Sequence, residues 1–151
     1  MASRNSKSGM AQEWYLIMAT MGAGRRILIV DDEAAIANSL ELIFSISGYE
    51  TRAAYSAEQA IEIMTEWEPD VAVVDVMLPW MNGIDFAVQL EAQYPDCAIV
   101  LMSGHPGTSA LISTAEQDGH SFDILAKPLH PERLLSAVSN RLARKPQAVK
   151  V

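Results

Sequence analysis

Five polar side chains that could do chemistry each lie at the end of a run of apolar residues. Asp31 and Asp32 follow ILIV, Asp75 ends VAVVD, Ser103 ends AIVLMS, and Lys127 follows FDILA. A carboxylate is costly to desolvate inside such a buried run, so Asp75 is expected to be the last residue of a strand rather than its middle. The turn signal LPWMNG follows almost at once and supports that position.

Three carboxylates held within a few ångströms raise one another's pKa unless a cation binds them. Mg²⁺ fits Asp31, Asp32 and Asp75 best, because it takes hard oxygen ligands, waters and phosphate oxygens, and no His or Cys lies nearby in the chain. With the Lys127 ammonium and the Ser103 hydroxyl to balance charge on a phosphoryl group, Asp75 becomes a candidate nucleophile that would form an aspartyl phosphate.

These residues need a scaffold that brings their strand ends together. From Arg26 the chain alternates between strand and helix patterns. We expect strands at 27–30, 50–54, 71–75, 98–103 and 122–126, and helices at 34–47, 56–67, 84–94, 108–118 and 131–142. Ser56 with Gln59 forms a capping box, Gly48 ends the first helix and Pro131 begins the last.

Five strand–helix units predict an α/β fold with a doubly wound, five-stranded parallel sheet and helices on both faces. A barrel would need about eight units and ~250 residues. If the strand order is 2-1-3-4-5, the first and third strands are neighbours and Asp31, Asp32 and Asp75 meet at one edge.

Composition limits the function classes. Residues 27–140 hold 18 acids and 3 bases, a net charge of −15, so direct nucleic-acid binding is not expected. The single Cys97 excludes an internal disulfide and favours a reducing, cytoplasmic location. Residues 10–21 are apolar but shorter than the ~20 residues of a membrane-spanning helix, so no membrane partner is expected. We interpret residues 1–24 as a flexible or loosely docked extension, 25–144 as one domain and 145–151 as a tail.

The motifs ILIVDDE, VVDVMLPWMNG, IVLMSGH and ILAKP occur in an order and at a spacing that resemble a known family. Over residues 25–144 the chain is similar to the receiver domain of two-component response regulators, the CheY-like family with a flavodoxin-like fold. The resemblance implies that Asp75 accepts a phosphoryl group from a histidine kinase or a phosphotransfer protein.

The same resemblance implies roles for the other site residues. Asp32 would bind Mg²⁺ directly, Asp31 would bind it through water, and the backbone carbonyl of Met77 would be a further ligand. Ser103 would follow the phosphoryl group as a switch hydroxyl. Lys127 would contact that group and precede a cis bond to proline.

One position departs from the family pattern. Ile124 stands where an aromatic switch residue usually lies, and Phe122, two residues earlier, shares its face by strand alternation. This departure suggests an alternative, a receiver-like binding module that does not switch by phosphorylation. We expect partners on the 108–118 helix, the fifth strand and the 131–142 helix, a surface that could also join two copies of the chain.

The same residues allow other interpretations. Asp31, Asp32 and Glu33 could simply cap the first helix. A phosphatase of the haloacid dehalogenase type needs a second Asp where Met77 stands, and DDEAAI would repel the phosphate of a flavin. The function expected is therefore a phosphorylation-controlled signalling switch for an unidentified downstream protein. It would not be an enzyme beyond catalysing its own phosphorylation and dephosphorylation.

Overall fold

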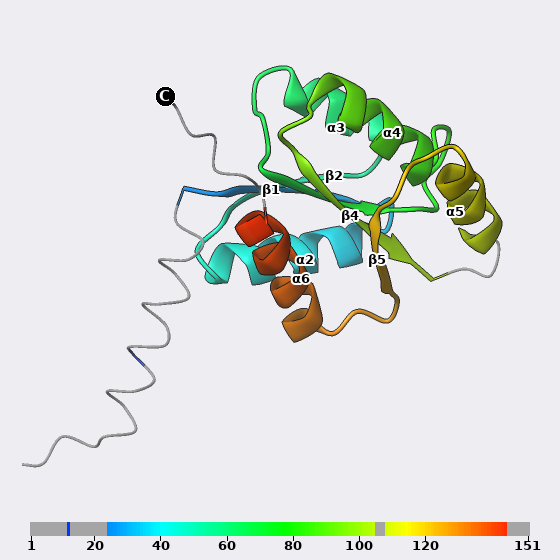
Figure 1. The fold of residues 1–151 in the computed structure, drawn as a ribbon. Coiled ribbons are helices and arrows are strands. Elements are labelled where there is room, and N and C mark those ends of the chain that lie inside the picture. The colour runs from blue at the N-terminus through cyan, green and yellow to red at the C-terminus, as the bar shows by residue number, and fades with distance from the viewer. Residues whose placement is uncertain (1–11, 13–23, 105–107, 145–151) are drawn as a thin grey trace, which may run out of the picture.

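The computed structural model describes residue 12 and residues 24–104 and 108–144 of this chain. Apart from Gln12 and Gly24, the predicted extension 1–24 and tail 145–151 lie outside the described residues. The described part is a central sheet with helices on both faces (Figure 1).

All five strands run parallel in the order β2-β1-β3-β4-β5, which confirms the predicted fold. The strands are β1 (Arg26–Val30), β2 (Glu50–Ala54), β3 (Val71–Asp75), β4 (Ala98–Ser103) and β5 (Asp123–Ala126). The helices are α2 (Ala34–Ile46), α3 (Ala57–Met64), α4 (Gly83–Gln93), α5 (Thr108–Gln117) and α6 (Pro131–Arg144).

The sheet separates two apolar layers. Helices α2 and α6 pack with Val71 and Val73 on one face, and α3, α4 and α5 pack with Ala72 and Val74 on the other. Every residue of the central strand β3 is buried, because helices cover both sides of it. Each fully buried valine contributes up to about 1.5–3 kcal/mol relative to exposure, so β3 is a rigid support for whatever follows it.

Several predicted helix ends are confirmed. The Ser56 hydroxyl accepts a hydrogen bond from the Gln59 N–H at 3.0 Å, and the Gln59 side chain accepts one from the Tyr55 N–H at 2.8 Å. Gly48 follows α2 with φ of 95°, a conformation that glycine adopts without strain. Pro131 begins α6.

Two helix ends differ from the prediction by more than one residue. Helix α3 ends at Met64 instead of Trp67, because the N–H groups of Thr65 and Glu66 bond to carbonyls three residues back, which tightens the last turn. Helix α6 continues past Leu142 to Arg144, whose guanidinium lies 2.8 Å from the Asp123 carboxylate at the start of β5. That partner is distant in sequence, so periodicity within the helix did not show it.

Candidate functional site

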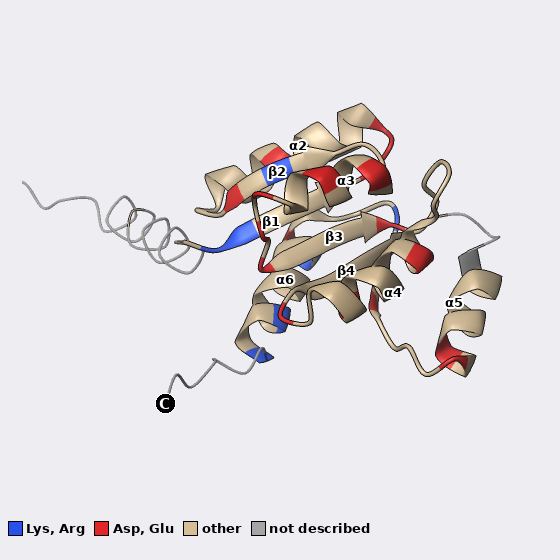
Figure 2. Ribbon diagram, turned by 90° about the horizontal axis from the view of Figure 1, so that it is seen from above, with Lys and Arg blue, Asp and Glu red and all other residues tan. Residues whose placement is uncertain are grey.

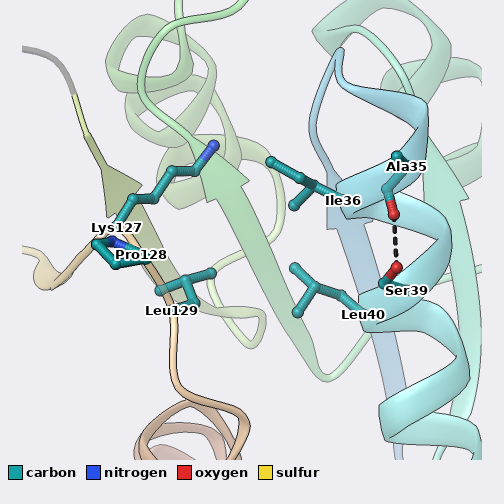
Figure 3. Close-up of a pocket in the computed structure, with 7 residues that line it drawn as sticks. All are labelled: Ala35, Ile36, Ser39, Leu40, Lys127, Pro128 and Leu129. Atoms are coloured by element: carbon teal, nitrogen blue, oxygen red, sulfur yellow. Dashed lines mark hydrogen bonds between the residues drawn. The ribbon is translucent and has the colours of Figure 1, made fainter.

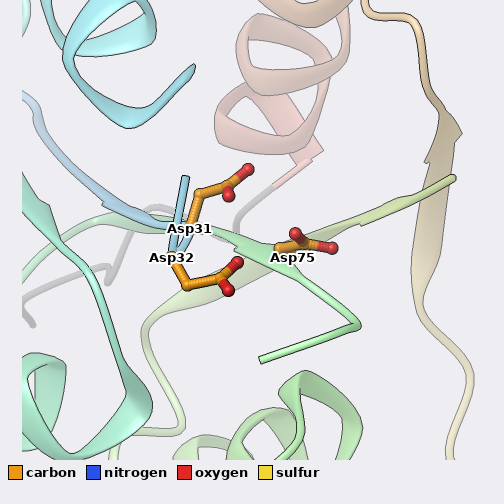
Figure 4. A group of neighbouring side chains, drawn as sticks. All are labelled: Asp31, Asp32 and Asp75. Carbon is orange, nitrogen blue, oxygen red and sulfur yellow. The ribbon is translucent and has the colours of Figure 1, made fainter. Parts of the chain in front are cut away.

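The site begins at the carboxyl ends of two neighbouring strands. Asp31 directly follows β1, and Asp75 is the last residue of β3, which pairs with β1. One carboxylate oxygen from each of Asp31, Asp32 and Asp75 lies within 4.8 Å of the others. Figure 4 shows the three side chains at this edge. The structure thus brings together the three carboxylates that the strand order placed side by side.

The three carboxylates differ in burial. Asp31 is 0% exposed and Asp75 is 2% exposed, and they are the only buried charged residues in the described ranges. Asp32 is exposed to solvent. Two carboxylates are therefore largely removed from water, while the third is in contact with solvent. The cluster needs positive charge to offset the desolvation of the two buried carboxylates.

Lys127 supplies one such charge. Its Nζ lies 3.0 Å from Asp31 Oδ2 and 3.0 Å from Asp75 Oδ2. The backbone sets this position, because the Lys127 N–H donates to the Ser103 carbonyl at 2.8 Å and continues the pairing of β4 with β5. The bond from Lys127 to Pro128 is cis, as the resemblance implies.

Burial and charge shift two pKa values in the site. Burial raises the pKa of Asp75; the hydrogen bond from Lys127 opposes this, and the neighbouring Asp31 charge adds to the rise. For Lys127, burial acts to lower the pKa, but its hydrogen bonds and ion pairs with Asp31 and Asp75 outweigh that effect and raise it. Lys127 thus stays protonated, and the Asp75 carboxylate lacks full compensation.

Backbone N–H groups orient the two buried carboxylates. Asp31 Oδ1 accepts from the Glu33 N–H at 2.9 Å, and Asp75 Oδ1 accepts from the Met77 N–H at 3.2 Å. Glu33 is the N-cap of α2, and its side chain makes no capping hydrogen bond. Helix capping by the acidic run therefore does not account for Asp31, whose carboxylate points to Lys127 and the cluster.

Gly83 was not among the predicted site residues. A Cβ at Gly83 would overlap the carbonyl oxygen of Asp75, and the Gly83 N–H donates to the Val76 carbonyl at 2.8 Å. The start of α4 therefore lies directly against the backbone that carries Asp75. The dipeptide NG within LPWMNG marked the turn, but only the path of the loop shows this close approach.

The remaining predicted residues lie around the cluster. Ser103 ends β4 one residue beyond Met102, the β-sheet partner of Asp75, and is half-buried. Met77 and Trp80 are in the loop between β3 and α4, and Trp80 is 86% exposed with φ of 62°. Ile124 is exposed on β5.

The donor set fits Mg²⁺. Asp31, Asp32 and Asp75 offer hard carboxylate oxygens at one point of the site, and one lysine faces two buried carboxylates, which leaves a charge deficit that a divalent cation would offset. The three predicted carboxylate ligands are therefore close enough to bind one metal ion.

The family model of the response regulator receiver domain matches residues 27–139. This chain belongs to that family. Receiver domains are generally non-enzymatic signalling switches of two-component systems, in which they interact with histidine kinases and bind Mg²⁺ at an acidic pocket. The expected family and its coarse function are thus confirmed.

Curated relatives include the DNA-binding response regulator MtrA of Mycolicibacterium paratuberculosis, 33% identical over 120 residues, which are 80% of this chain and 52% of MtrA. The response regulator MprA of Mycobacterium ulcerans is 33% identical over 119 residues, 79% of this chain and 50% of MprA. The chain thus spans about half the length of these relatives.

Two solved structures show the same fold. The signal receiver domain of an HD domain-containing protein from Pseudomonas fluorescens Pf-5 has a TM-score of 0.73 and 29% identity, covering 80% of this chain and 96% of that one. The CheY-like receiver domain protein from Methanospirillum hungatei JF-1 has a TM-score of 0.72 and 26% identity, covering 80% and 95%. Among the described residues, no helix is long and apolar enough to cross a membrane.

Proposed function

We propose that this receiver domain is switched by phosphorylation of Asp75, with a histidine kinase or a phosphotransfer protein as the donor. The observation that carries the proposal is the position of one carboxylate at the end of β3, within 4.8 Å of two further carboxylates and 3.0 Å from the Lys127 ammonium. Asp31 has the same neighbours, but it follows β1, whereas Asp75 ends the strand that pairs with β4 and so lies next to the strand that carries Ser103.

In the proposed reaction an oxygen of the Asp75 carboxylate attacks the phosphorus of the donor. A bond forms between that oxygen and phosphorus, and the bond from phosphorus to the donor breaks, so that the donor group leaves with the electron pair. In the metal-free domain, burial raises the pKa of Asp75, so a cation beside the carboxylate would favour the anion that attacks. Hydrolysis of the aspartyl phosphate would release inorganic phosphate and regenerate the free carboxylate.

Lys127 and Ser103 would hold the transferred group. The Lys127 Nζ already contacts Asp75 Oδ2, so its charge is in place to stabilise negative charge on the phosphoryl oxygens. Ser103, on the neighbouring strand, would donate its hydroxyl hydrogen to one of these oxygens and thereby connect the site to the segment that follows β4.

Asp32 and Asp75 would hold Mg²⁺ directly, Asp31 would hold it through water, and the Met77 carbonyl would complete the protein ligands. When bound, Mg²⁺ would neutralise charge on the phosphoryl oxygens and on the carboxylates. The electrostatic deficit at the buried carboxylates supports this assignment.

The test is phosphorylation of the full chain with acetyl phosphate and Mg²⁺, read by intact mass. We expect one added phosphoryl group, its loss in Asp75→Asn, and its retention in the matched control Asp96→Asn, which removes an exposed carboxylate from the loop before β4. Full labelling of Asp75→Asn would place the acceptor elsewhere and reject the assignment.

A further inference from the structure

The solvent face of α2 is unusually poor in charge for this acidic domain. Glu41 is the one charged residue of the helix, and it is half-buried. The exposed positions are Ala34, Ala35, Asn38, Ser39, Leu42, Ser45 and Ile46. By contrast, α3 exposes Glu58 and Glu62, and Figure 2 shows acidic residues on that helix. A solvent face without charged residues is typical of a surface that another segment or molecule covers.

Apolar side chains lie along this face in one row. Leu42 and Ile46, one helical turn apart, are 61% and 58% exposed, the most exposed large aliphatic side chains in the described ranges. Ala35 and Ser39 continue the row toward the start of the helix. We call these four residues, Ala35, Ser39, Leu42 and Ile46, the α2 stripe.

The upper end of the α2 stripe opens into a groove. Ile36 and Leu40 face Lys127, Pro128 and Leu129 across an apolar space of about 380 Å³, which Ala35 and Ser39 also line (Figure 3). The lower end, at Ile46, lies four residues before Glu50, the first residue of β2. The stripe therefore runs from the edge that carries the site to the opposite edge of the sheet.

The chain before β1 leaves the domain beside that lower end. The Glu50 N–H donates to the Arg25 carbonyl at 2.9 Å, and Arg26 pairs with Glu50 in the sheet. Gly24 has φ of 75°, so the backbone turns just before the first strand. Four residues span at most about 14 Å, so Met21 lies within that distance of Arg25.

The preceding segment has the composition to cover the α2 stripe. Residues 10–21, MAQEWYLIMATM, carry a single charge, at Glu13. Trp14, Ile17, Met18 and Met21 recur at the spacing that places side chains on one face of a helix. We propose that residues 14–21 of this chain dock on the α2 stripe, with Ile17, Met18 and Met21 over Leu42 and Ile46.

Two physical arguments favour this occupant over a second copy of the chain. The segment is tethered next to the stripe, which gives it an effective concentration in the millimolar range without any partner. Two copies, each with a net charge of −8, repel one another as they approach. Docking of the segment removes exposed apolar surface on both sides without desolvating a charge.

Cross-linking within the full chain tests the proposal. In a Cys97→Ser background, Thr20→Cys is paired with Leu42→Cys and treated with a short bifunctional maleimide. The matched control pairs Thr20→Cys with Glu62→Cys, an exposed position on α3, which covers the other face of the sheet. Because docking raises the local concentration, the α2 pair should react at least about tenfold faster than the α3 pair, as an intramolecular product.

Ile46→Asp added to the α2 pair places a charge in the stripe without disturbing the buried face of α2, and it should bring the cross-linking rate down to that of the control. Equal rates for the two pairs, or a rate unaffected by Ile46→Asp, would overturn the proposal. A product of doubled mass in place of the intramolecular one would also overturn it and identify a second copy as the occupant.

Discussion

At the scale of single residues, the site is governed by two buried carboxylates that share one ammonium. Asp31 and Asp75 both contact the Lys127 Nζ, and Asp32 adds a third negative charge nearby. The folded domain therefore holds more negative charge in this place than its own side chains compensate. A bound cation would offset the repulsion among these carboxylates. The same residues that destabilise the metal-free domain therefore favour cation binding.

The first prediction concerns Asp75→Asn in metal-free buffer. Because folding raises the pKa of Asp75 above its ordinary value of 3.8, the folded state favours the protonated group, and this contribution to stability is lost as pH rises through the folded pKa. At pH 7 the neutral asparagine avoids that loss, so the variant should melt at a higher temperature than the native chain. The difference should shrink as pH falls through the folded pKa and be smallest below about 4.

Thermal melts of both proteins and of Asp96→Asn across this pH range measure the effect. The control should show no comparable gain, since its carboxylate is exposed. A variant that is less stable than the native chain at pH 7 without metal would contradict the reasoning.

The second prediction concerns Lys127→Met. Removing the ammonium leaves Asp31 and Asp75 buried without their shared partner, and we expect a loss of about 3 kcal/mol in metal-free buffer, the low end for breaking a buried pair because 15% of the lysine side chain is exposed. Mg²⁺ should then raise the melting temperature of the variant by more than it raises that of the native chain.

Arg133→Met is the matched control, because it removes an exposed positive charge from the first turn of α6. It should leave both quantities nearly unchanged. Equal responses of Lys127→Met and the native chain to Mg²⁺ would show that Lys127 does not share its carboxylates with the metal.

At the scale of elements, the start of α4 packs against the backbone of Asp75. Gly83→Ala would force a methyl group against the Asp75 carbonyl, and neither backbone can yield easily, so we expect a loss of about 1–3 kcal/mol and slower phosphorylation by acetyl phosphate. Gly104→Ala is the comparison, since the three atoms nearest to a Cβ there are side-chain carbons of Lys127, at 3.0–3.4 Å, and none of them is a backbone atom.

Chemical denaturation and the rate of phosphorylation measure both variants. Gly104→Ala should be the more stable of the two. Equal stabilities would mean that the loop between β3 and α4 relaxes around the new methyl group.

The elements also show what the sequence can and cannot predict. The meeting of Asp31, Asp32 and Asp75 was predictable, because parallel strands end at one edge and the apolar runs mark those ends. The contact of Gly83 with Asp75 was not, because it depends on the path of a loop. The extension of α6 was missed because Asp123, the partner of Arg144, lies 21 residues away.

Trp67 also makes contacts with residues that are distant in sequence. Its indole N–H donates to Glu50 at 2.9 Å, and the guanidinium groups of Arg26 and Arg52 lie 5.4 and 5.1 Å from its ring. These contacts join β1, β2 and the end of α3, and they explain why Trp67 is buried outside the helix that its sequence position suggested. Pairings between separate elements were the part that local patterns did not contain.

At the scale of the whole molecule, the layers on the sheet differ in how firmly they are anchored. Helix α4 buries Ile84, Phe86 and Leu90, whereas Ala115 is the one buried residue among the described side chains of α5. Strand β5 lies at the edge of the sheet beyond β4, and Ile124 on it is exposed. Weakly anchored elements open at low free-energy cost, so α5 and β5 are the parts that a change at Ser103 and Lys127 can move.

The last prediction follows from that difference. A phosphoryl group adds up to about −2 of charge at Asp75, and Lys127, at the end of β5, contacts it directly. Beryllofluoride with Mg²⁺, which imitates the phosphoryl group, should therefore change amide hydrogen exchange in residues 109–117 and 123–126, with smaller changes in α3, which lies farther along the sheet. Asp75→Asn under the same conditions should show none of these changes. Ile124, 38% exposed on β5, presents less apolar surface than an aromatic ring, so Ile124→Phe should enlarge the difference between the two states. Changes confined to the loops that carry Asp31, Asp32 and Asp75 would instead show a domain that binds the group without passing the signal to α5 and β5.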